Sequence, residues 1–444
     1  MKTRILISIL FCLPVLLAKG QWSYTNLSES KEAMGATSLG TKAYFAGGTN
    51  DDETIDYSKV EIYDTKAKTW SFGDLSKGRL FPTGISSGSK VFFAGGGINN
   101  KTFDIVDIYD TVTQKWTIEH LSAPRVLVSA VTKGNKVLFA GGYNGESNTV
   151  SNVVDIYDTQ TDQWSKDTLS MARSSMGVAV VGDLALFAGG FNLKSYTNRV
   201  DIYNFTTGKW TTDTLSKARG LTGVAAVGNK VLIAGGMTDP KLASSATDLV
   251  DIYDAQTGKW STAKLSFPRC FSERAAVTIG DKVYFTGGGQ FLGTILLWYS
   301  TYNLIDIYDN KTGTWAVDHL THDVINHAVT VVDNALLIAG GSSMKGWIVF
   351  NTVEIFTQNL SSSPELINNQ DFQIYPNPAK DILTIAVPSG VIIDGIIIYN
   401  HAGQKVQQQK PVGNRVNISK LNKGMYFLVL TCEQKQIRKK LIVD

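Results

Sequence analysis

Short apolar segments that end in paired glycines recur along most of the chain. KVFFAGG (90–96) is one example, and DIVDIYD (104–110), which follows it, is a short segment rich in β-branched and aromatic residues. Both patterns predict short β-strands. The Gly-Gly pairs stand at 47/48, 95/96, 141/142, 189/190, 235/236, 287/288 and 340/341, with spacings of 46 to 53 residues. Self-similarity at this period predicts a repeat architecture.

Aromatic residues mark the second half of each repeat. Six repeats place a tyrosine seven residues before a tryptophan: Tyr63/Trp70, Tyr109/Trp116, Tyr157/Trp164, Tyr203/Trp210, Tyr253/Trp260 and Tyr308/Trp315. Each repeat yields four short strands, and a four-stranded sheet buries neither face alone. Sheets arranged radially bury their faces against one another, so the pattern predicts an all-β propeller.

The combination of an apolar strand, Gly-Gly, and Tyr and Trp at fixed spacing resembles the kelch repeat family. The resemblance covers seven repeats and about three quarters of the chain. It implies a seven-bladed β-propeller over residues 21–359.

The seventh repeat is incomplete at its end. Phe356 stands where the tyrosine is expected, and seven residues later comes Ser363 instead of a tryptophan. QWSYTNLS (21–28) has the wording of the missing outer strand, since QWSKDTLS (163–170) shares its frame. We therefore predict that the N-terminal strand, with Trp22, completes blade 7 and removes an exposed sheet edge.

The first twenty residues have the features of a signal peptide. Lys2 and Arg4 precede an apolar run, and Ala18-Lys19-Gly20 supplies small residues for cleavage. The whole chain has 42 basic and 39 acidic residues. Removal of the leader takes away Lys2, Arg4 and Lys19, so the chain after residue 20 has 39 of each. This balance of charge predicts no nucleic-acid partner. We also predict no further membrane span. Cys270 and Cys432 lie in different predicted domains, so we predict no disulfide.

A second, smaller domain follows a polar linker at 360–370. Residues 371–444 contain strand-like segments separated by turn residues, which predict a small β-sandwich. Tyr375-Pro376-Asn377-Pro378, Gly424-Met425-Tyr426 and the basic residues 438–440 make this domain similar to the C-terminal sorting domain of the Bacteroidota type IX secretion system. That resemblance implies transfer by the secretion machinery to the cell surface or the medium.

Residues that recur in every repeat are interpreted as framework. An acid two residues before the tyrosine position occurs seven times: Glu61, Asp107, Asp155, Asp201, Asp251, Asp306 and Glu354. An arginine recurs in five repeats: Arg79, Arg125, Arg173, Arg219 and Arg269. We expect the arginines to pair with the acids, because a buried acid needs a partner. The alternative is that they line the pore entrance and bind anions.

Residues that break the repeat are candidates for function. Loops joining strands 2–3 and 4–1 are long and varied, whereas the other loops are tight turns, so the first set marks the face for binding. The ligand-binding candidates on this face of blades 6 and 7 are Arg269, Arg274, Trp298, Tyr299, His322, His327 and Trp347. They form either a recognition site or a diverged blade whose apolar loop packs on its neighbours.

The motifs give two hypotheses for function. The first is an exported module that binds or adheres to a protein or glycan through the loop-rich face. The second is a carbohydrate-active enzyme, epimerase- or oxidase-like, that uses the loops of blades 6 and 7. His322, Asp323 and His327 do not have a recognised metal-ligand spacing, so we predict no metal, cofactor or catalytic set.

Overall fold

The computed structural model describes residues 21–50, 57–242, 245–272, 275–292, 297–358, 372–386, 393, 395–400, 404–409, 414–432 and 435–444. The predicted leader (1–20) and the predicted linker (360–370) lie outside these residues. The chain divides into two compact units, residues 1–359 and 360–444, and each is considered separately. No α-helix occurs in the described part of either unit.

The first unit contains seven antiparallel four-stranded sheets, one for each repeat. Blade 1 holds β2 (Gly35–Leu39), β3 (Lys42–Ala46), β4 (Lys59–Asp64) and β5 (Thr69–Asp74). Blade 2 holds β6 (Thr83–Ser87), β7 (Lys90–Ala94), β10 (Ile105–Asp110) and β11 (Lys115–His120). Blade 3 holds β12 (Ser129–Lys133), β13 (Lys136–Ala140), β16 (Val153–Asp158) and β17 (Gln163–Thr168). Blade 4 holds β18 (Gly177–Val181), β19 (Leu184–Ala188), β20 (Arg199–Asn204) and β21 (Lys209–Thr214).

The remaining blades follow the same order of strands, except at the seventh. Blade 5 holds β22 (Gly223–Val227), β23 (Lys230–Ala234), β24 (Leu249–Asp254) and β25 (Lys259–Lys264). Blade 6 holds β26 (Ala276–Ile279), β27 (Lys282–Thr286), β30 (Leu304–Asp309) and β31 (Thr314–His319). Blade 7 holds β32 (Ala328–Val332), β33 (Ala335–Ala339), β36 (Thr352–Thr357) and, as its outer strand, β1 (Gln21–Asn26).

The first strands of the blades form a closed ring. Each contacts the next, from β2 through β6, β12, β18, β22 and β26 to β32, and β32 contacts β2. The core lies between adjacent blades: the ring of Phe92 in blade 2 packs against Phe139 and Tyr157 in blade 3, with centroids 6.3 and 5.5 Å away. Such ring pairs bury large apolar areas, which explains why the aromatic pattern repeats.

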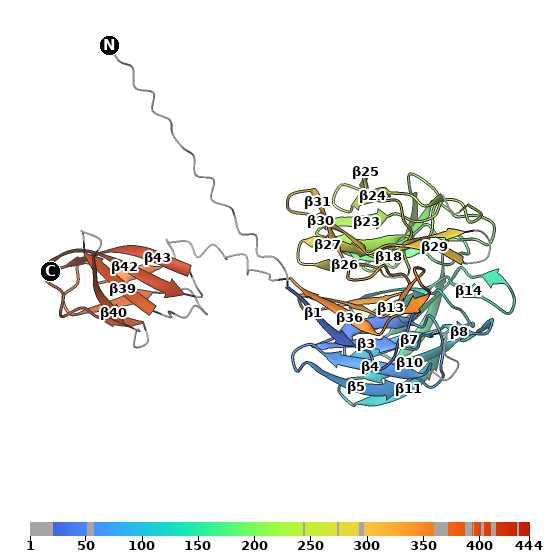
Figure 1. The fold of residues 1–444 in the computed structure, drawn as a ribbon, viewed down its shortest axis with the longest axis horizontal. Coiled ribbons are helices and arrows are strands. Elements are labelled where there is room, and N and C mark those ends of the chain that lie inside the picture. Colours follow the sequence, from blue (N-terminus) through green and yellow to red (C-terminus); the bar gives the residue numbers. More distant parts are fainter. Residues whose placement is uncertain are drawn as a thin grey trace, which may run out of the picture. The chain divides into compact units, whose positions relative to one another are not determined.

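The N-terminal strand closes the ring of blades. β1 pairs with β36 along its whole length, and Trp22 lies opposite Phe356 with ring centroids 5.0 Å apart. Figure 1 shows the two strands, blue and orange, side by side. The Trp70 indole of blade 1 donates a hydrogen bond to Thr25 Oγ1 (3.0 Å), just as Trp210 donates to Asp167 in the preceding blade. The strand expected from the incomplete seventh repeat thus has the contacts of its counterparts.

The second unit is a small β-sandwich. One sheet has the order β37 (Gln373–Tyr375), β38 (Ile382–Ala386), β41 (Arg415–Asn417), and the other β40 (Lys405–Gln409), β39 (Gly395–Asn400), β42 (Gly424–Cys432), β43 (Lys435–Val443). One apolar cluster joins the sheets, with Leu383 and Val416 from the first and Ile398, Leu428 and Leu441 from the second fully buried. Each sheet thereby covers one face of the other.

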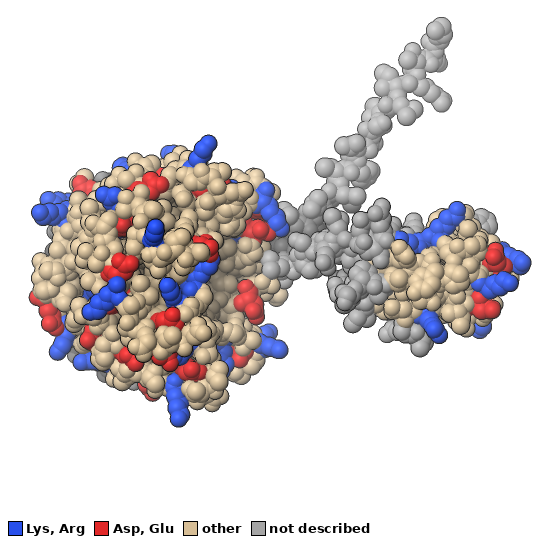
Figure 2. Space-filling model, turned by 180° about the vertical axis from the view of Figure 1, so that it is seen from behind, with Lys and Arg blue, Asp and Glu red and all other residues tan. Residues whose placement is uncertain are grey.

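The charged side chains of the propeller are dispersed. Figure 2 shows acidic and basic groups interspersed over the visible face of this unit. Within the described residues, no helix is long and apolar enough to cross a membrane.

Candidate functional site

The two faces of the propeller differ in the structure of their loops. On one face, third and fourth strands are joined by tight turns, in which Asp64 Oδ1 accepts hydrogen bonds from the amides of Lys66 and Ala67 (both 2.9 Å). Four loops of the other face form small hairpins: β8 (Gly97–Ile98) with β9 (Lys101–Thr102), β14 (Tyr143–Asn144) with β15 (Thr149–Val150), β28 (Gly289–Leu292) with β29 (Leu297–Thr301), and β34 (Ser342–Ser343) with β35 (Ile348–Val349). We call this second face the loop-rich face.

The repeated arginines lie inside the blades. All five guanidinium groups are buried and pair with the acid on the third strand of their own blade: Arg79–Asp107, Arg125–Asp155, Arg173–Asp201, Arg219–Asp251 and Arg269–Asp306. The pore-entrance alternative for Arg79, Arg125, Arg173 and Arg219 is therefore wrong, and so is a ligand-binding role for Arg269. Burial lowers the pKa of each arginine, and the neighbouring carboxylate opposes that effect.

These arginines also hold the glycine-rich end of the second strand. Arg173, for example, donates hydrogen bonds to the carbonyls of Gly189 (2.9 Å) and Phe187 (3.0 Å). Two blades lack this arginine. In blade 1 Lys31 takes its place, with Nζ 3.6 Å from Glu61 Oε1. In blade 7 the equivalent residue is Val324, which carries no charge. Glu354 of blade 7 accepts hydrogen bonds from the amide and the hydroxyl of Thr321, and the acids of the other blades accept the equivalent amide bond, as Asp201 does from Ser170. The sevenfold acids are framework that satisfies buried polar groups.

Blade 7 presents aromatic side chains on the loop-rich face. Trp347, at the turn of the β34–β35 hairpin, has 68% of its surface exposed, and Ile348 beside it has 49%. The exposed imidazole of His322 stacks on Phe350, with ring planes 9° apart and centroids at 4.6 Å. Trp347 also has a φ of +52°, which is unfavourable for a bulky residue.

Blade 6 contributes its own hairpin to this face. Trp298 and Tyr299 belong to β29, and Thr301 at its end lies against the blade 7 hairpin, because the Met344 amide donates to Thr301 Oγ1 (3.3 Å). The hairpins of the two blades are therefore neighbours. The side chains of Trp298 and Tyr299, and the whole of Arg274, fall outside what the structure describes.

His327 is buried, unlike His322. Only 2% of its surface is exposed, and its Nε2 lies 2.9 Å from Thr286 Oγ1. The Thr286 hydroxyl donates its single proton to the Ala275 carbonyl (3.0 Å). In its contact with His327 the hydroxyl can therefore only accept, so His327 Nε2 carries the ring proton and donates it to Thr286 Oγ1. Burial lowers the pKa of His327 to about 4. The prediction that His327 is a surface ligand contact is wrong, because the folded blade encloses its ring.

Acid should destabilise the propeller through His327. The imidazole is neutral in the folded chain and titrates near 6.5 when unfolded, so its stabilising contribution is present above pH 6.5 and is lost as pH falls toward 4. Between pH 7 and 5 we expect a loss of about 2 kcal/mol in the free energy of unfolding. Urea titrations across this range measure it.

Two histidine variants isolate this effect. His327→Val should flatten the pH dependence, since blade 3 carries Val128 at the equivalent position. His322→Ala should retain the parent's dependence, because that ring is exposed. An unchanged slope in the His327→Val protein would contradict the assignment.

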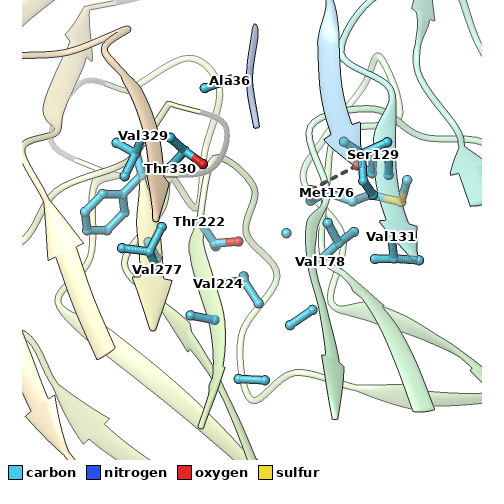
Figure 3. A pocket seen from close by; sticks show the side chains of 18 of the residues that line it. Ala36, Ser129, Val131, Met176, Val178, Thr222, Val224, Val277, Val329 and Thr330 are labelled. Carbon is cyan, nitrogen blue, oxygen red and sulfur yellow. Dashed lines mark hydrogen bonds between the residues drawn. The ribbon is translucent and has the colours of Figure 1, made fainter. Parts of the chain in front are cut away.

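A channel runs along the ring of first strands. Its cavity has a volume of about 470 Å³ and is lined by residues of all seven blades, among them Ile85, Val131, Val178, Val277 and Val329. Figure 3 shows Val131, Val178, Val277 and Val329 around the opening. A second cavity of about 30 Å³ adjoins it at Ser272 and is lined also by His327 and Asn326. The sequence predicted a pore but not its lining, because the lining residues come from separate repeats and carry no shared motif.

The family of the propeller follows from its blades and from a comparison with known families. The family model of the KLHDC2/KLHL20/DRC7 Kelch-repeats domain matches residues 83–289 and 127–341, which together span more than half of the chain. The chain belongs to the Kelch-repeat family. The solved "Structure of YjhT" is 16% identical and matches with a TM-score of 0.50 over 76% of this chain and 97% of that one, which shows a shared fold.

The second unit belongs to a different family. Residues 373–444 match the secretion system C-terminal sorting domain. This kelch protein is therefore a type IX secretion substrate that reaches the cell surface or the medium. A 66-residue segment is 38% identical to "Beta-agarase A" of Zobellia galactanivorans, over 14% of this chain and 12% of that protein. A match over so small a part of the agarase does not extend its activity to this chain.

Proposed function

We propose that this secreted kelch protein binds a protein or glycan ligand through the loop-rich face of blades 6 and 7. The exposed Trp347 on the β34–β35 hairpin carries the proposal. Large aromatic side chains that stand free on a rigid scaffold are typical anchors of interfaces. The stacked His322–Phe350 pair lies in the same blade, and Trp298 and Tyr299 belong to the neighbouring hairpin.

The backbone at Trp347 adds to this argument. A φ of +52° costs a bulky residue roughly 1 kcal/mol that glycine or asparagine would not incur. Strained positions of this kind cluster at binding sites, where the side chain has a use besides stability. In the proposed layout, a leader at 1–20 directs export, and a linker at 360–370 joins the binding propeller to the sorting domain.

Replacing Trp347 should remove binding without harming the fold. We expect Trp347→Asn to weaken ligand binding by about 2 kcal/mol, roughly thirtyfold, and to leave the melting temperature unchanged or slightly raised, because asparagine tolerates positive φ. Residues 21–444 would be screened on arrays of neutral and acidic glycans and in pull-downs with surface proteins. The best ligand would then be titrated by calorimetry.

A matched control is available on the opposite face. Val112 has 79% of its surface exposed in a tight turn there, so Val112→Asn should bind like the parent. Equal binding by the Trp347→Asn protein would show that the hairpin is not the contact surface. Formation of a product from an array ligand would instead favour the carbohydrate-active enzyme.

A further inference from the structure

The segment that closes the ring of blades also holds the base of the hairpin that carries Trp347. The Lys31 amide donates a hydrogen bond to the Phe350 carbonyl (3.0 Å), and the Gly341 amide donates one to the Lys31 carbonyl (2.8 Å). Gly341 and Phe350 flank the β34–β35 hairpin on its two sides. We call residues 21–34, which comprise β1 and the loop that leads to β2, the closing segment.

Blade 3 contains a counterpart of this arrangement. Residues 163–176 correspond in sequence to the closing segment, and they hold the base of the β14–β15 hairpin. There the Arg173 amide donates to the Ser151 carbonyl (3.0 Å), and the Gly142 amide donates to the Arg173 carbonyl (3.1 Å). The two segments differ in their connection, because β17 follows β16 in the chain, whereas β1 belongs to blade 7 only through its pairing with β36. The closing segment can therefore leave blade 7 without breaking up the other strands.

The side chain that anchors each segment differs as well. Arg173 forms an ion pair with Asp201 (2.7 Å) and donates hydrogen bonds to two backbone carbonyls of blade 4. The Lys31 ammonium lies 3.6 Å from Glu61 Oε1 and 4.0 Å from Glu29 Oε2, beyond hydrogen-bond distance. Unlike a guanidinium, an ammonium has no planar fork of donors that could tie several acceptors together. The anchor of the closing segment is therefore the weaker one.

This anchor is also costly to bury. Only 1% of Lys31 is exposed, and burial lowers the pKa of its ammonium, an effect that Glu61 and Glu29 oppose. Its Nζ and the two facing carboxylate oxygens are buried without a hydrogen-bond partner among the residues that the structure describes. Release of the closing segment would return these groups to water, which lowers the free energy that release requires.

We propose that the closing segment is a releasable strap. Its release opens the ring between blades 7 and 1 and frees the base of the Trp347 hairpin, while blades 2 to 6, each with its buried arginine, stay closed. Local opening of this kind is drawn from the least stabilised parts of a fold. Because the closing segment holds both ends of the hairpin, its state sets the rigidity of the aromatic surface. That effect on binding rests on the proposed function, whereas the opening itself does not.

Hydrogen exchange of residues 21–444, followed by mass spectrometry without ligand, tests the strap. After correction for intrinsic rates, we expect the amides of 27–34 to exchange about tenfold faster than those of 169–176. The amides of 341–350 should exceed those of the blade 3 hairpin, 142–151, by a similar factor, because the closing segment and its hairpin open together. Fast exchange confined to 21–26 would be fraying of a chain end and would overturn the proposal, as would equal rates in 27–34 and 169–176.

A double variant gives blade 1 the anchor of the other blades. Lys31→Arg/Glu61→Asp recreates the arginine–aspartate pair, and it should slow the exchange of 27–34 and 341–350 about fivefold to tenfold without changing that of 169–176. Lys194→Arg, the same replacement of lysine on an exposed loop, should leave every segment like the parent.

Two results with the double variant would contradict the strap. One is an unchanged rate in 27–34, and the other is equal slowing in all blades, which would indicate a general gain in stability. No ligand takes part in these measurements. The strap and the binding role of Trp347 can therefore fail separately.

Discussion

Arg173→Leu should lower the free energy of unfolding by about 3–5 kcal/mol, because the substitution leaves Asp201 buried without its cation. It also removes the donors to the Gly189 and Phe187 carbonyls, which fix the end of the second strand. Chemical denaturation of residues 21–444 measures the change. The protein that remains folded should bind ligand like the parent, since the guanidinium is enclosed in blade 4.

The cost should come from the uncompensated carboxylate. The double variant Arg173→Leu/Asp201→Leu should therefore recover much of the lost stability, because an apolar pair leaves no buried charge. Lys194→Leu, on an exposed loop of the same blade, should change stability by less than about 0.5 kcal/mol. If Arg173→Leu unfolds like the parent but loses ligand affinity, the arginines are binding residues after all.

Trp22→Ala should lower the free energy of unfolding by about 3 kcal/mol, near the low end for a tryptophan truncation because its ring is only partly buried. The lost contacts are those with Phe356 and with the core between blades 6 and 7. Since β1 is the outer strand of blade 7, weakening it also loosens its junction with blade 1. Thermal and urea melts give the magnitude.

Another residue of the same strand provides the comparison. Tyr24 has 55% of its surface exposed, so Tyr24→Ala should have a small effect on stability. If both variants melt at the parent's temperature, the closing strand contributes little to the ring. If both are equally destabilised, strand pairing matters more than the indole.

Repetition made the fold predictable from the sequence. The spacing of Tyr63 and Trp70, repeated five more times, indicated both the blades and the surfaces that bury them. The absence of a tryptophan seven residues after Phe356 indicated where Trp22 belongs. These features are local in sequence and are set by packing that recurs in each blade, so one repeat helps to interpret the others.

The candidate site was less predictable, because function lies in departures from the repeat. His322 and His327 look alike in the sequence, yet one is exposed and the other is enclosed beside Thr286. The arginines were ambiguous because five copies suit either an ion-pair framework or an anion site, and only their burial distinguishes the two.

The pairing of β1 with β36 orders the events of folding. The partners Trp22 and Phe356 are separated by more than 300 residues, so this contact forms only after the intervening blades exist. Such non-local pairings slow folding, and until then β36 presents an open edge to other chains. The closing strand is also the first part of the propeller to be synthesised. During export this strand must stay unpaired until the last blade arrives, which makes blade 7 the place where a periplasmic chaperone would have most to protect.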